Sequence, residues 1–281
     1  MLDDVVRYLA CPHCGGGLAR DGGTLRCATG HVFDIARQGY VSLFAAGAGP
    51  GRADTAAMVA ARAGFLAAGH YARLAAELAA ALATELPGDV PGCVADVGTG
   101  TGYYLAAALE QLPGRYGVAL DASKFALRRA ARAHPRLGAV ACDVWRRIPL
   151  TDGAAAAALS VFAPRDGAGL RRVLHPGGWL FVVTPRAGHL AELAGPLGLL
   201  SVDARKPERL AATLEPHFTP VWRREHTTTL TLDRVAAQAA AAMGPSAWHT
   251  DPDTLAQRAA ALPDPVPVTL AVTLSAFRAR P

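Results

Sequence analysis

A stretch of twelve residues constrains the fold more than any other part of the chain. It reads Cys-Val-Ala-Asp-Val-Gly-Thr-Gly-Thr-Gly-Tyr-Tyr, from Cys93 to Tyr104, and it predicts a short buried strand, a glycine turn and the start of a helix. Gly98, Gly100 and Gly102 let the backbone turn sharply and approach a ligand where a Cβ would prevent it. The helix would point unpaired N–H groups and a positive dipole end at that ligand. Such a turn binds either a dinucleotide pyrophosphate or the amino-acid end of S-adenosyl-L-methionine (SAM).

The spacing of the glycines separates these two ligands. The dinucleotide fingerprint is Gly-x-Gly-x-x-Gly, which would require a glycine at Tyr103. Here the spacing is Gly-x-Gly-x-Gly, with Asp96 two residues before the first glycine. It is similar to the first SAM motif of the Rossmann-like methyltransferases, although glycine-rich turns also occur as plain connectors. We therefore expect SAM as the cofactor, held at the turn by Asp96, Thr99 and Tyr103 together with the three glycines.

The strands that follow should bring further groups to the cofactor. A second buried strand over residues 115–121 ends in Asp121, about 20 residues past the turn, where this fold binds ribose hydroxyls. A third strand, over residues 139–143, ends in an acid that suits the adenine amino group. A fourth, over residues 155–161, closes at Phe162 and should face the transferable methyl, because ligands sit outside the carboxyl ends of open parallel sheets. The expected contacts on these strands are Asp121, Ala122, Asp143, Val144 and Val161.

The rest of the chain continues this pattern. A Leu-His-Pro-Gly-Gly turn at residues 174–178 opens a fifth strand over residues 179–183, and such a turn is a second recurrent mark of these methyltransferases. A helix is expected over residues 205–218, two edge strands over residues 221–232 and a final strand over residues 267–277. Together these patterns predict an α/β fold of the Rossmann-like class I methyltransferase type.

The first forty residues carry a metal-ligand pattern. Two residues separate Cys11 from Cys14, twelve lie between this pair and Cys27, and three separate Cys27 from His31. This spacing is typical of a structural Zn²⁺ site. Four ligands predict a closed tetrahedral site that stabilises the fold rather than performing chemistry. His13, inside the first knuckle, is the competing ligand, and unliganded buried thiols are the alternative.

A small, glycine-rich linker at residues 45–51 should lead into two helices. Asp54 or Thr55 can cap the first helix, and the second should run over residues 71–86, ending before Pro87. The expected organisation is therefore a small N-terminal zinc-binding domain followed by the methyltransferase sheet. The expected domain boundaries are 1–44 for the zinc knuckle, 45–88 for the linker loop and helices, and 89–281 for the SAM-dependent domain.

Composition adds weaker constraints. The formal net charge is +5, and nearly all of the cations are arginines, Lys124 and Lys206 being the only lysines. This balance is compatible with a nucleic-acid partner but does not require one. No apolar run approaches the ~20 residues of a membrane span, and the N-terminus does not resemble an export signal. We therefore expect a cytoplasmic protein that does not contact a membrane.

At this point the chain resembles a known family, the 23S ribosomal RNA (guanine-N1) methyltransferases, including the macrolide (tylosin)-resistance type of actinomycetes. The resemblance runs nearly end to end and includes the zinc knuckle. It implies SAM-dependent methylation of N1 of a guanine in a 23S rRNA hairpin near the peptide exit tunnel, by a protein that is usually a homodimer. Further matching segments begin at Phe33 (FDIARQGY), Gly69 (GHY), Asp96 (DVGTGTG), Phe162 (FAP) and Met243 (MGPSAW).

The implied reaction suggests which residues act on the substrate. Methyl transfer from a sulfonium needs an in-line approach, loss of the N1 proton and exclusion of water, so positioning supplies most of the effect. Phe162 and Trp248 are candidates for clamping a flipped base, although Trp248 could instead cover the core under a loop. His70, His189 or Asp54 could accept a proton or orient the base, although a lone histidine is more often structural.

Two alternatives remain open at the level of sequence. Family members carry basic residues in the loop before the Asp54 helix, whereas residues 45–51 here are neutral and leave Arg52 alone. Because RNA affinity depends heavily on phosphate contacts, the first alternative is a natural-product methyltransferase acting on a small heteroaromatic, for example at C3 of an indole. The second is a non-catalytic zinc-knuckle RNA-binding protein, against which the intact Asp96 and Asp121 argue.

Overall fold

The computed structural model describes residues 2–45, 47, 49, 51, 53–86, 88–199, 203 and 205–281. Part of the expected linker at residues 45–51, and the lone cation Arg52 that follows it, lie outside the described residues. Pro87, which was expected to follow the end of a helix, also lies outside them. The statements below concern the described residues.

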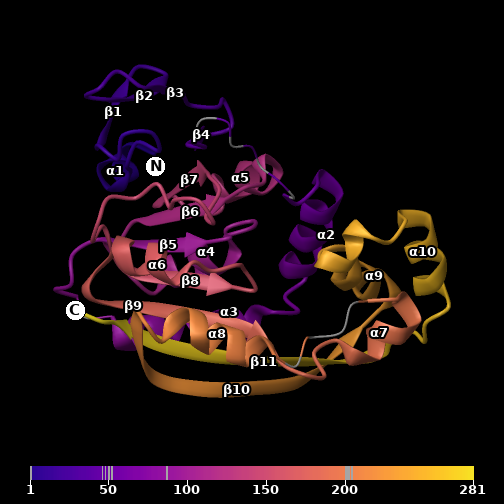
Figure 1. Ribbon diagram of the computed structural model, residues 1–281. Coiled ribbons are helices and arrows are strands. Elements are labelled where there is room, and N and C mark those ends of the chain that lie inside the picture. Colours follow the sequence, from indigo (N-terminus) through magenta and orange to yellow (C-terminus); the bar gives the residue numbers. More distant parts are fainter. Residues whose placement is uncertain are drawn as a thin grey trace.

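A sheet of eight strands forms the centre of the protein, in the order β10-β11-β9-β8-β5-β6-β7-β4 (Figure 1). The six strands from β4 to β9 in this order run parallel, whereas β11 is antiparallel to both β9 and β10. This arrangement confirms the predicted α/β class with a Rossmann-like parallel sheet. The strands are β4 (Tyr40–Ser42), β5 (Cys93–Val97), β6 (Gly117–Asp121), β7 (Leu137–Ala141), β8 (Ala155–Val161), β9 (Leu174–Pro185), β10 (Phe218–Leu232) and β11 (Val266–Ala279).

Two of the expected strands differ from those observed. Residues 221–232 do not form two edge strands, and that prediction was wrong: β10 is one strand whose partners run from Ala279 to Val266 of β11, with one irregularity near Pro220. The partner strand is equally long, so pairing continues where we expected a break. β9 already begins at Leu174, so the Pro-Gly-Gly segment lies inside a strand with a register shift opposite Ala155 and Ala157.

Helices cover both faces of the sheet. On one face, the apolar sides of α3, α4 and α5 pack on side chains such as Val94 and Ala119, and on the other, α6 and α8 pack on neighbours such as Ala95 and Val118. This alternation follows from the two-residue period of a strand. The helices are α3 (Ala72–Glu85), α4 (Tyr103–Glu110), α5 (Lys124–Ala130), α6 (Gly167–Val173) and α8 (Lys206–Leu214).

A second group of helices forms a cap beyond the carboxyl ends of the parallel strands, at the right of Figure 1. Phe65 and Leu66 of α2 share a core with Ala237 and Ala240 of α9 and with Leu255 of α10. The carboxyl edge of the sheet is the edge at which open α/β sheets bind ligands. The cap consists of α2 (Ala56–Ala67), α7 (Ala191–Leu197), α9 (Arg234–Ala242), the 3₁₀ turn η2 (Pro245–Trp248) and α10 (Pro252–Ala260).

The N-terminal residues form a small ribbon that packs directly on the large sheet. Val5 of α1, Leu25 of β2 and Phe33 of β3 belong to the same buried cluster as Val118 and Val140 of the large sheet. The domain boundary expected at residue 44 stays a prediction, but β4 itself belongs to the large sheet, where it pairs in parallel with β7. The ribbon consists of α1 (Leu2–Val5), the 3₁₀ turn η1 (Val6–Tyr8), β1 (Leu18–Asp21), β2 (Thr24–Cys27) and β3 (Val32–Asp34).

The contact between Val5 and Gly138 allows a test of this shared core. A Cβ at Gly138 would overlap the side chain of fully buried Val5. We expect Gly138→Ala to lower the free energy of unfolding by about 1–3 kcal/mol through overpacking. In the Val5→Ala/Gly138→Ala double variant the loss should be smaller than the sum of the two single losses. Urea unfolding measures this, with Gly23→Ala, which meets nothing within 4 Å, as the control; strictly additive losses would contradict the contact.

Candidate active site and metal centre

The four expected metal ligands lie together at the tip of the ribbon. The ligand atoms of Cys11, Cys14, Cys27 and His31 all lie within 4.8 Å of one another. Sγ of Cys14 is 3.7 Å from Sγ of Cys27, and Nδ1 of His31 is 3.3 Å from Sγ of Cys27. Zn–S bonds of ~2.3 Å in a tetrahedron place two sulfur atoms roughly 3.8 Å apart. The donor set and its spacing therefore fit Zn²⁺.

Thr29 supports this cluster from within the second knuckle. Its hydroxyl lies 3.0 Å from Sγ of Cys27 and donates to Sγ of Cys14 at 3.2 Å. The Thr29 hydroxyl, together with His31, lowers the pKa of the Cys27 thiol to about 5, and the thiolate is the form that binds metal. His13, the competing ligand, is not part of the cluster; its ring stacks on Phe33 at a centroid distance of 5.7 Å.

The glycine turn between β5 and α4 has the backbone that its sequence predicted. Gly98, Gly100 and Gly102 all have positive φ, at 76°, 56° and 80°. A Cβ on Gly98 would lie 2.5 Å from the Cβ of Ala163, in the segment after β8. Because L side chains rarely adopt this conformation and the turn is also crowded, glycine is required at this turn. The close approach also places the end of β8 directly beside the turn.

Asp121, at the end of β6, holds the turn in place. Its Oδ2 accepts a hydrogen bond from the Gly100 N–H and its Oδ1 accepts one from the Ser123 N–H, each at 2.8 Å. Burial raises the pKa of this carboxyl, and the two backbone N–H groups oppose that shift. Ser123 caps α5 through a side-chain bond from the Ala126 N–H. Asp121 thus lies where a ribose-binding acid was expected.

Asp96 is the buried acid beneath the turn. Its Oδ2 accepts the Thr99 hydroxyl at 2.7 Å, whereas its Oδ1 is buried with no hydrogen-bond partner. Burial raises the pKa of Asp96 to about 7. A buried oxygen without a partner is costly, so this atom suits a ligand that carries donors or positive charge. SAM, which carries an ammonium and a sulfonium, fits that requirement.

The other residues expected to contact the cofactor lie near the same edge of the sheet, but no hydrogen bond between them and the glycine turn is seen among the described residues. Val144 and Val161 are buried at the carboxyl ends of β7 and β8, and Ala122 is half-buried beside Asp121. Asp143 lies two residues beyond the end of β7, and its Oδ1 accepts the Trp145 N–H at 3.0 Å. The side chain of Tyr103 lines a groove between α3 and α4. Tyr103 contributes its backbone to the turn, because it is the first residue of α4.

Arg62 of α2 joins the cap to the glycine turn, and sequence reasoning did not select it. Its guanidinium pairs with the Asp54 carboxylate and donates from Nη2 to the Met243 carbonyl at 2.7 Å. Nη1 also lies 3.4 Å from the position that a Cβ on Gly100 would occupy. The Asp54 carbonyl accepts the Ser123 hydroxyl at 2.7 Å. Because its carboxylate is engaged by Arg62, Asp54 is better placed to orient this edge than to accept a proton.

An aromatic cluster lies at the carboxyl end of β8. The Phe162 ring stacks on His189 at a centroid distance of 5.8 Å, and Tyr71 lies 6.2 Å from Phe162 and 6.5 Å from His189. Phe162 and Leu190 are the only non-glycine residues with positive φ in the described part of the chain, both at 54°. Backbone strain of this kind concentrates at functional sites. Phe162 is also 38% exposed, so its ring is open to a ligand.

The two histidines of this region differ in their surroundings. Nδ1 of His189 accepts the Ala271 N–H at 3.3 Å, so Nε2 is the ring atom that carries a proton. His70 packs its ring on Phe65 at 4.7 Å, which is a structural contact. Tyr71, which sequence reasoning did not select either, is buried, and its hydroxyl has no hydrogen-bond partner. This hydroxyl is a second buried polar group that suits a ligand.

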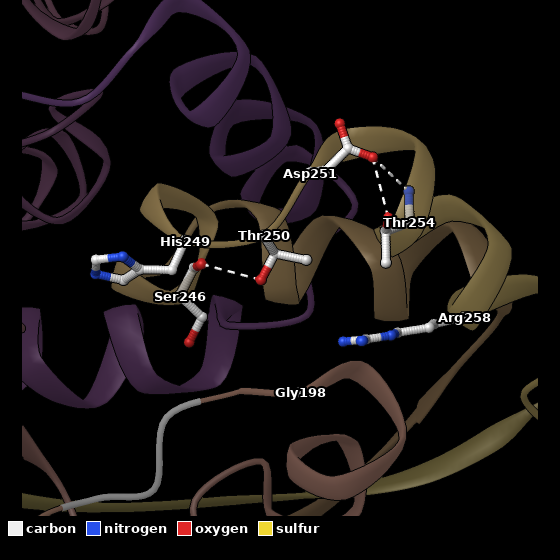
Figure 2. A pocket seen from close by; sticks show the side chains of 7 residues that line it. All are labelled: Gly198, Ser246, His249, Thr250, Asp251, Thr254 and Arg258. Carbon is white, nitrogen blue, oxygen red and sulfur yellow. Dashed lines mark hydrogen bonds between the residues drawn. The ribbon is translucent and has the colours of Figure 1, made fainter.

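Trp248 lies in the cap rather than in the aromatic cluster. It ends η2, five residues after the Met243 carbonyl that Arg62 binds, and its side chain is 37% exposed. Beside it, Ser246 and His249 line a cavity of about 380 Å³ (Figure 2). Arg258 reaches across this cavity to the Leu197 carbonyl at 3.4 Å, so its guanidinium supports the end of α7.

The chain is similar in sequence to known proteins of one family. Residues 9–47 match the model of the N-terminal zinc ribbon of RlmA. The chain is 52% identical over 283 residues to a 23S rRNA (guanine(748)-N(1))-methyltransferase of Streptomyces fradiae, with both chains covered completely. The chain belongs to the 23S rRNA (guanine-N1) methyltransferase family. A candidate 23S rRNA (guanine-N(1)-)-methyltransferase of Micromonospora griseorubida is 50% identical, with 99% of each chain covered.

Solved structures agree on the fold. A candidate methyltransferase from Bacillus halodurans superposes with a TM-score of 0.52 at 16% identity, covering 72% of this chain and 99% of that one. As a member of the guanine-N1 methyltransferase family, the chain is a SAM-dependent enzyme with a zinc ribbon. The turn, Asp96 and Asp121 would hold SAM, and the Cys/His cluster would hold Zn²⁺. In the described part of the chain, no helix is both long and apolar enough to cross a membrane.

The Asp121 geometry predicts a loss of cofactor affinity in Asp121→Asn. The amide keeps the shape of the side chain but removes the charge that strengthens its hydrogen bonds to N–H and hydroxyl donors. We expect the Kd for SAM to rise about tenfold or more, a cost of about 1.4 kcal/mol, as measured by calorimetry. Asp253→Asn, an exposed carboxylate in the first turn of α10, is the control and should leave the Kd unchanged. An unaltered Kd in Asp121→Asn would remove this residue from the cofactor site.

The shared core predicts that zinc removal affects more than the ribbon. Because Cys11 and Cys27 lie in the same buried cluster as Val118 of β6, a strong chelator should lower the melting temperature of the whole chain in one cooperative transition. Calorimetric melting with a dye assay for released Zn²⁺ measures this. Cys93→Ala changes a buried thiol outside the ligand set and should keep one Zn²⁺ per chain. Two separate transitions, the later one unshifted, would contradict this expectation.

Proposed function

We propose that this chain methylates N1 of a guanine in a 23S rRNA hairpin, using SAM. The observation that carries the proposal is the strained, exposed Phe162 at the end of β8, beside the glycine turn and stacked on His189. A base can be held at this point only when it has left its helix. The relatives named above for rRNA guanine-N1 methylation support the same reading, and we propose the guanine equivalent to position 748 as the target.

The chemistry of guanine N1 indicates what the protein must provide. N1 becomes a nucleophile when its proton passes to a water molecule before the site closes over the base, and the resulting negative charge is shared with O6 of the base. The Nε2–H of His189, fixed by the Ala271 N–H at Nδ1, is suited to donate to O6 and to stabilise that charge. Bound SAM supplies the methyl group on its sulfonium. The surrounding aromatic rings would stack on the base and exclude water.

The neighbouring Tyr71 hydroxyl is the second group that we assign to positioning. It is buried and without a partner, and burial raises its pKa, so it stays protonated and acts as a hydrogen-bond donor. Trp248, in the cap beyond Met243, would cover the base from the side opposite the sheet. We assign Asp54 and His70 to supporting roles, since both side chains are engaged by neighbours.

The alternative substrate and the non-catalytic reading find less support. Both relatives of about 50% identity carry names for rRNA methylation, and neither name refers to a small heteroaromatic. We further infer that the protein acts in the cytoplasm, where its RNA substrate is made, and that it forms a homodimer. A contribution to macrolide resistance, as in the tylosin-resistance type, is part of the same proposal.

The proposal is tested by locating the methyl group. Purified enzyme, SAM and 23S rRNA transcripts are incubated, and primer extension is read for a stop, because a methyl on N1 blocks Watson–Crick pairing. We expect one stop, at the guanine equivalent to position 748. Phe162→Ala should lower kcat/KM about 10- to 100-fold, since base stacking contributes about 1–3 kcal/mol. Val235→Ala, which changes a highly exposed residue of α9, is the control.

Three results would count against the proposal. An absence of any stop with enzyme that binds SAM would remove RNA as the substrate. A stop at an unrelated position would keep the reaction and reject the site. An unaltered kcat/KM in Phe162→Ala would leave the reaction intact and move the base away from this cluster.

A further inference from the structure

One exposed tryptophan remains unexplained by the core, the cofactor or the aromatic cluster. Among the residues that the structure describes, three Phe, Tyr or Trp side chains are exposed: Trp145, Phe162 and Trp248. The last two belong to the proposed base site. Trp145 is the most exposed of the three, at 64%. Tryptophan is enriched at interfaces relative to the rest of the protein surface, so this ring is a candidate contact for a partner.

The segment that carries Trp145 is a tight, well-bonded turn. This turn follows the carboxyl end of β7, and both the side chain and the carbonyl of Asp143 accept hydrogen bonds from it. Oδ1 of Asp143 accepts the Trp145 N–H at 3.0 Å, and the Asp143 carbonyl accepts the N–H groups of Arg146 and Arg147 at 3.2 and 3.3 Å. The ring is therefore presented to solvent by a turn whose backbone hydrogen bonds are satisfied.

Two arginines follow Trp145 in the same turn. The Arg146 guanidinium is largely exposed and lies 3.8 Å from the Asp143 carboxylate. Arg147 extends to the zinc ribbon, where its Nη2 lies 3.1 Å from the position that a Cβ on Gly15 would occupy. Residues 144–151 contain no Asp or Glu. The turn thus presents one exposed ring and two guanidinium groups between the sheet edge and the ribbon.

The neighbouring helix α5 and the residues after it add further cations. α5 begins at Lys124, directly after β6, and residues 122–142 contain no acidic residue. Its Lys124 and Arg128 both lie over the Phe125 ring, at 5.3 and 5.6 Å. Arg129 and Arg132 are exposed. The segment between Asp121 and Asp143 therefore carries positive charge only.

The charge decides which ligand suits Trp145. The adenine of SAM, expected near Asp143, could in principle stack on this ring. SAM is a cation, however, and its adenine carries no negative charge. The guanidinium groups of Arg146 and Arg147 would therefore contribute nothing to binding the adenine. A polyanion with exposed aromatic bases satisfies both features, because bases stack on aromatic rings and phosphates pair with arginine. That description is of single-stranded RNA.

We propose that Trp145, Arg146 and Arg147 form a second RNA contact, in which Trp145 stacks an unpaired base of the substrate hairpin and the two arginines bind its phosphates. This inference rests on the proposed rRNA substrate and goes beyond it by naming a surface away from the methylated base. It also supplies basic contacts that residues 45–51 lack. RNA hairpin loops provide unpaired bases of this kind.

The test compares RNA binding with SAM binding in the same full-length variants. We expect Trp145→Ala to raise the Kd for a 23S hairpin transcript about 10- to 100-fold, and Trp145→Phe to retain most of the affinity. The Kd for SAM and the melting temperature should stay unchanged in both. In a salt titration, Arg146→Gln/Arg147→Gln should reduce the slope of log K against log salt by about 1.4, two contacts at ~0.7 each.

A matched arginine pair provides the control. Arg223 and Arg224 are adjacent in β10, at the opposite edge of the sheet, and Arg223→Gln/Arg224→Gln should leave the salt slope unchanged. An equal loss of slope in both double variants would reduce the effect to net charge and overturn the proposal. A rise in the Kd for SAM with unaltered RNA affinity in Trp145→Ala would assign the ring to adenine and overturn it as well.

Different results would reject the proposed rRNA substrate and the proposed RNA contact at Trp145. If wild-type enzyme methylates 23S rRNA and Trp145→Ala binds the hairpin as tightly as wild type, only the second contact is rejected. If wild-type enzyme binds SAM but neither binds nor methylates the RNA, the proposed function fails, and this surface is rejected with it.

Discussion

The half-buried carboxylate of Asp121 organises the ligand edge of this protein. Asp121 uses one oxygen for the N–H of Gly100 and the other for the N–H of Ser123, so the glycine turn and the start of α5 are held in one geometry. Ser123 in turn donates to the carbonyl of Asp54. Asp54 engages Arg62, and Arg62 reaches the carbonyl of Met243 in the cap. The glycine turn and the cap are therefore connected by a continuous set of polar contacts.

Sequence alone located the parts of this network that depend on short-range spacing. The glycine turn, the acid at the end of β6 and the Cys/His pairs each need particular residue types a fixed number of positions apart, and such signals are visible without a structure. The contact between Arg62 and Met243 was not predicted, because the two residues lie 181 positions apart and no local pattern pairs them, although Met243 begins a matching segment. Tyr71 was noticed only as part of a matching segment, since the missing hydrogen-bond partner of its hydroxyl is a three-dimensional property.

The errors in the strands have a similar origin. An alternating pattern indicates a strand but not its length, and the length of β10 follows from its partner β11, which pairs with it from Phe218 to Leu232. The zinc spacing likewise predicts the ligands without predicting what the ribbon packs against. In the structure, the long segment between β7 and β8 contains no helix, and the ribbon covers that part of the sheet instead, through residues such as Val5 and Leu9.

β4 lies at one edge of the large sheet, and its shortness affects how that edge can pair with other chains. A parallel sheet that ended at β7 would offer a row of unpaired backbone groups to other chains, which is a route to aggregation. β4 occupies that edge with only three residues, Tyr40–Ser42, and therefore leaves little template for another chain. At the opposite edge, β10 carries three consecutive charged residues, Arg223, Arg224 and Glu225, and charged side chains on an edge strand disfavour pairing with another chain. The short strand that follows the ribbon thus protects the large sheet from edge-to-edge association.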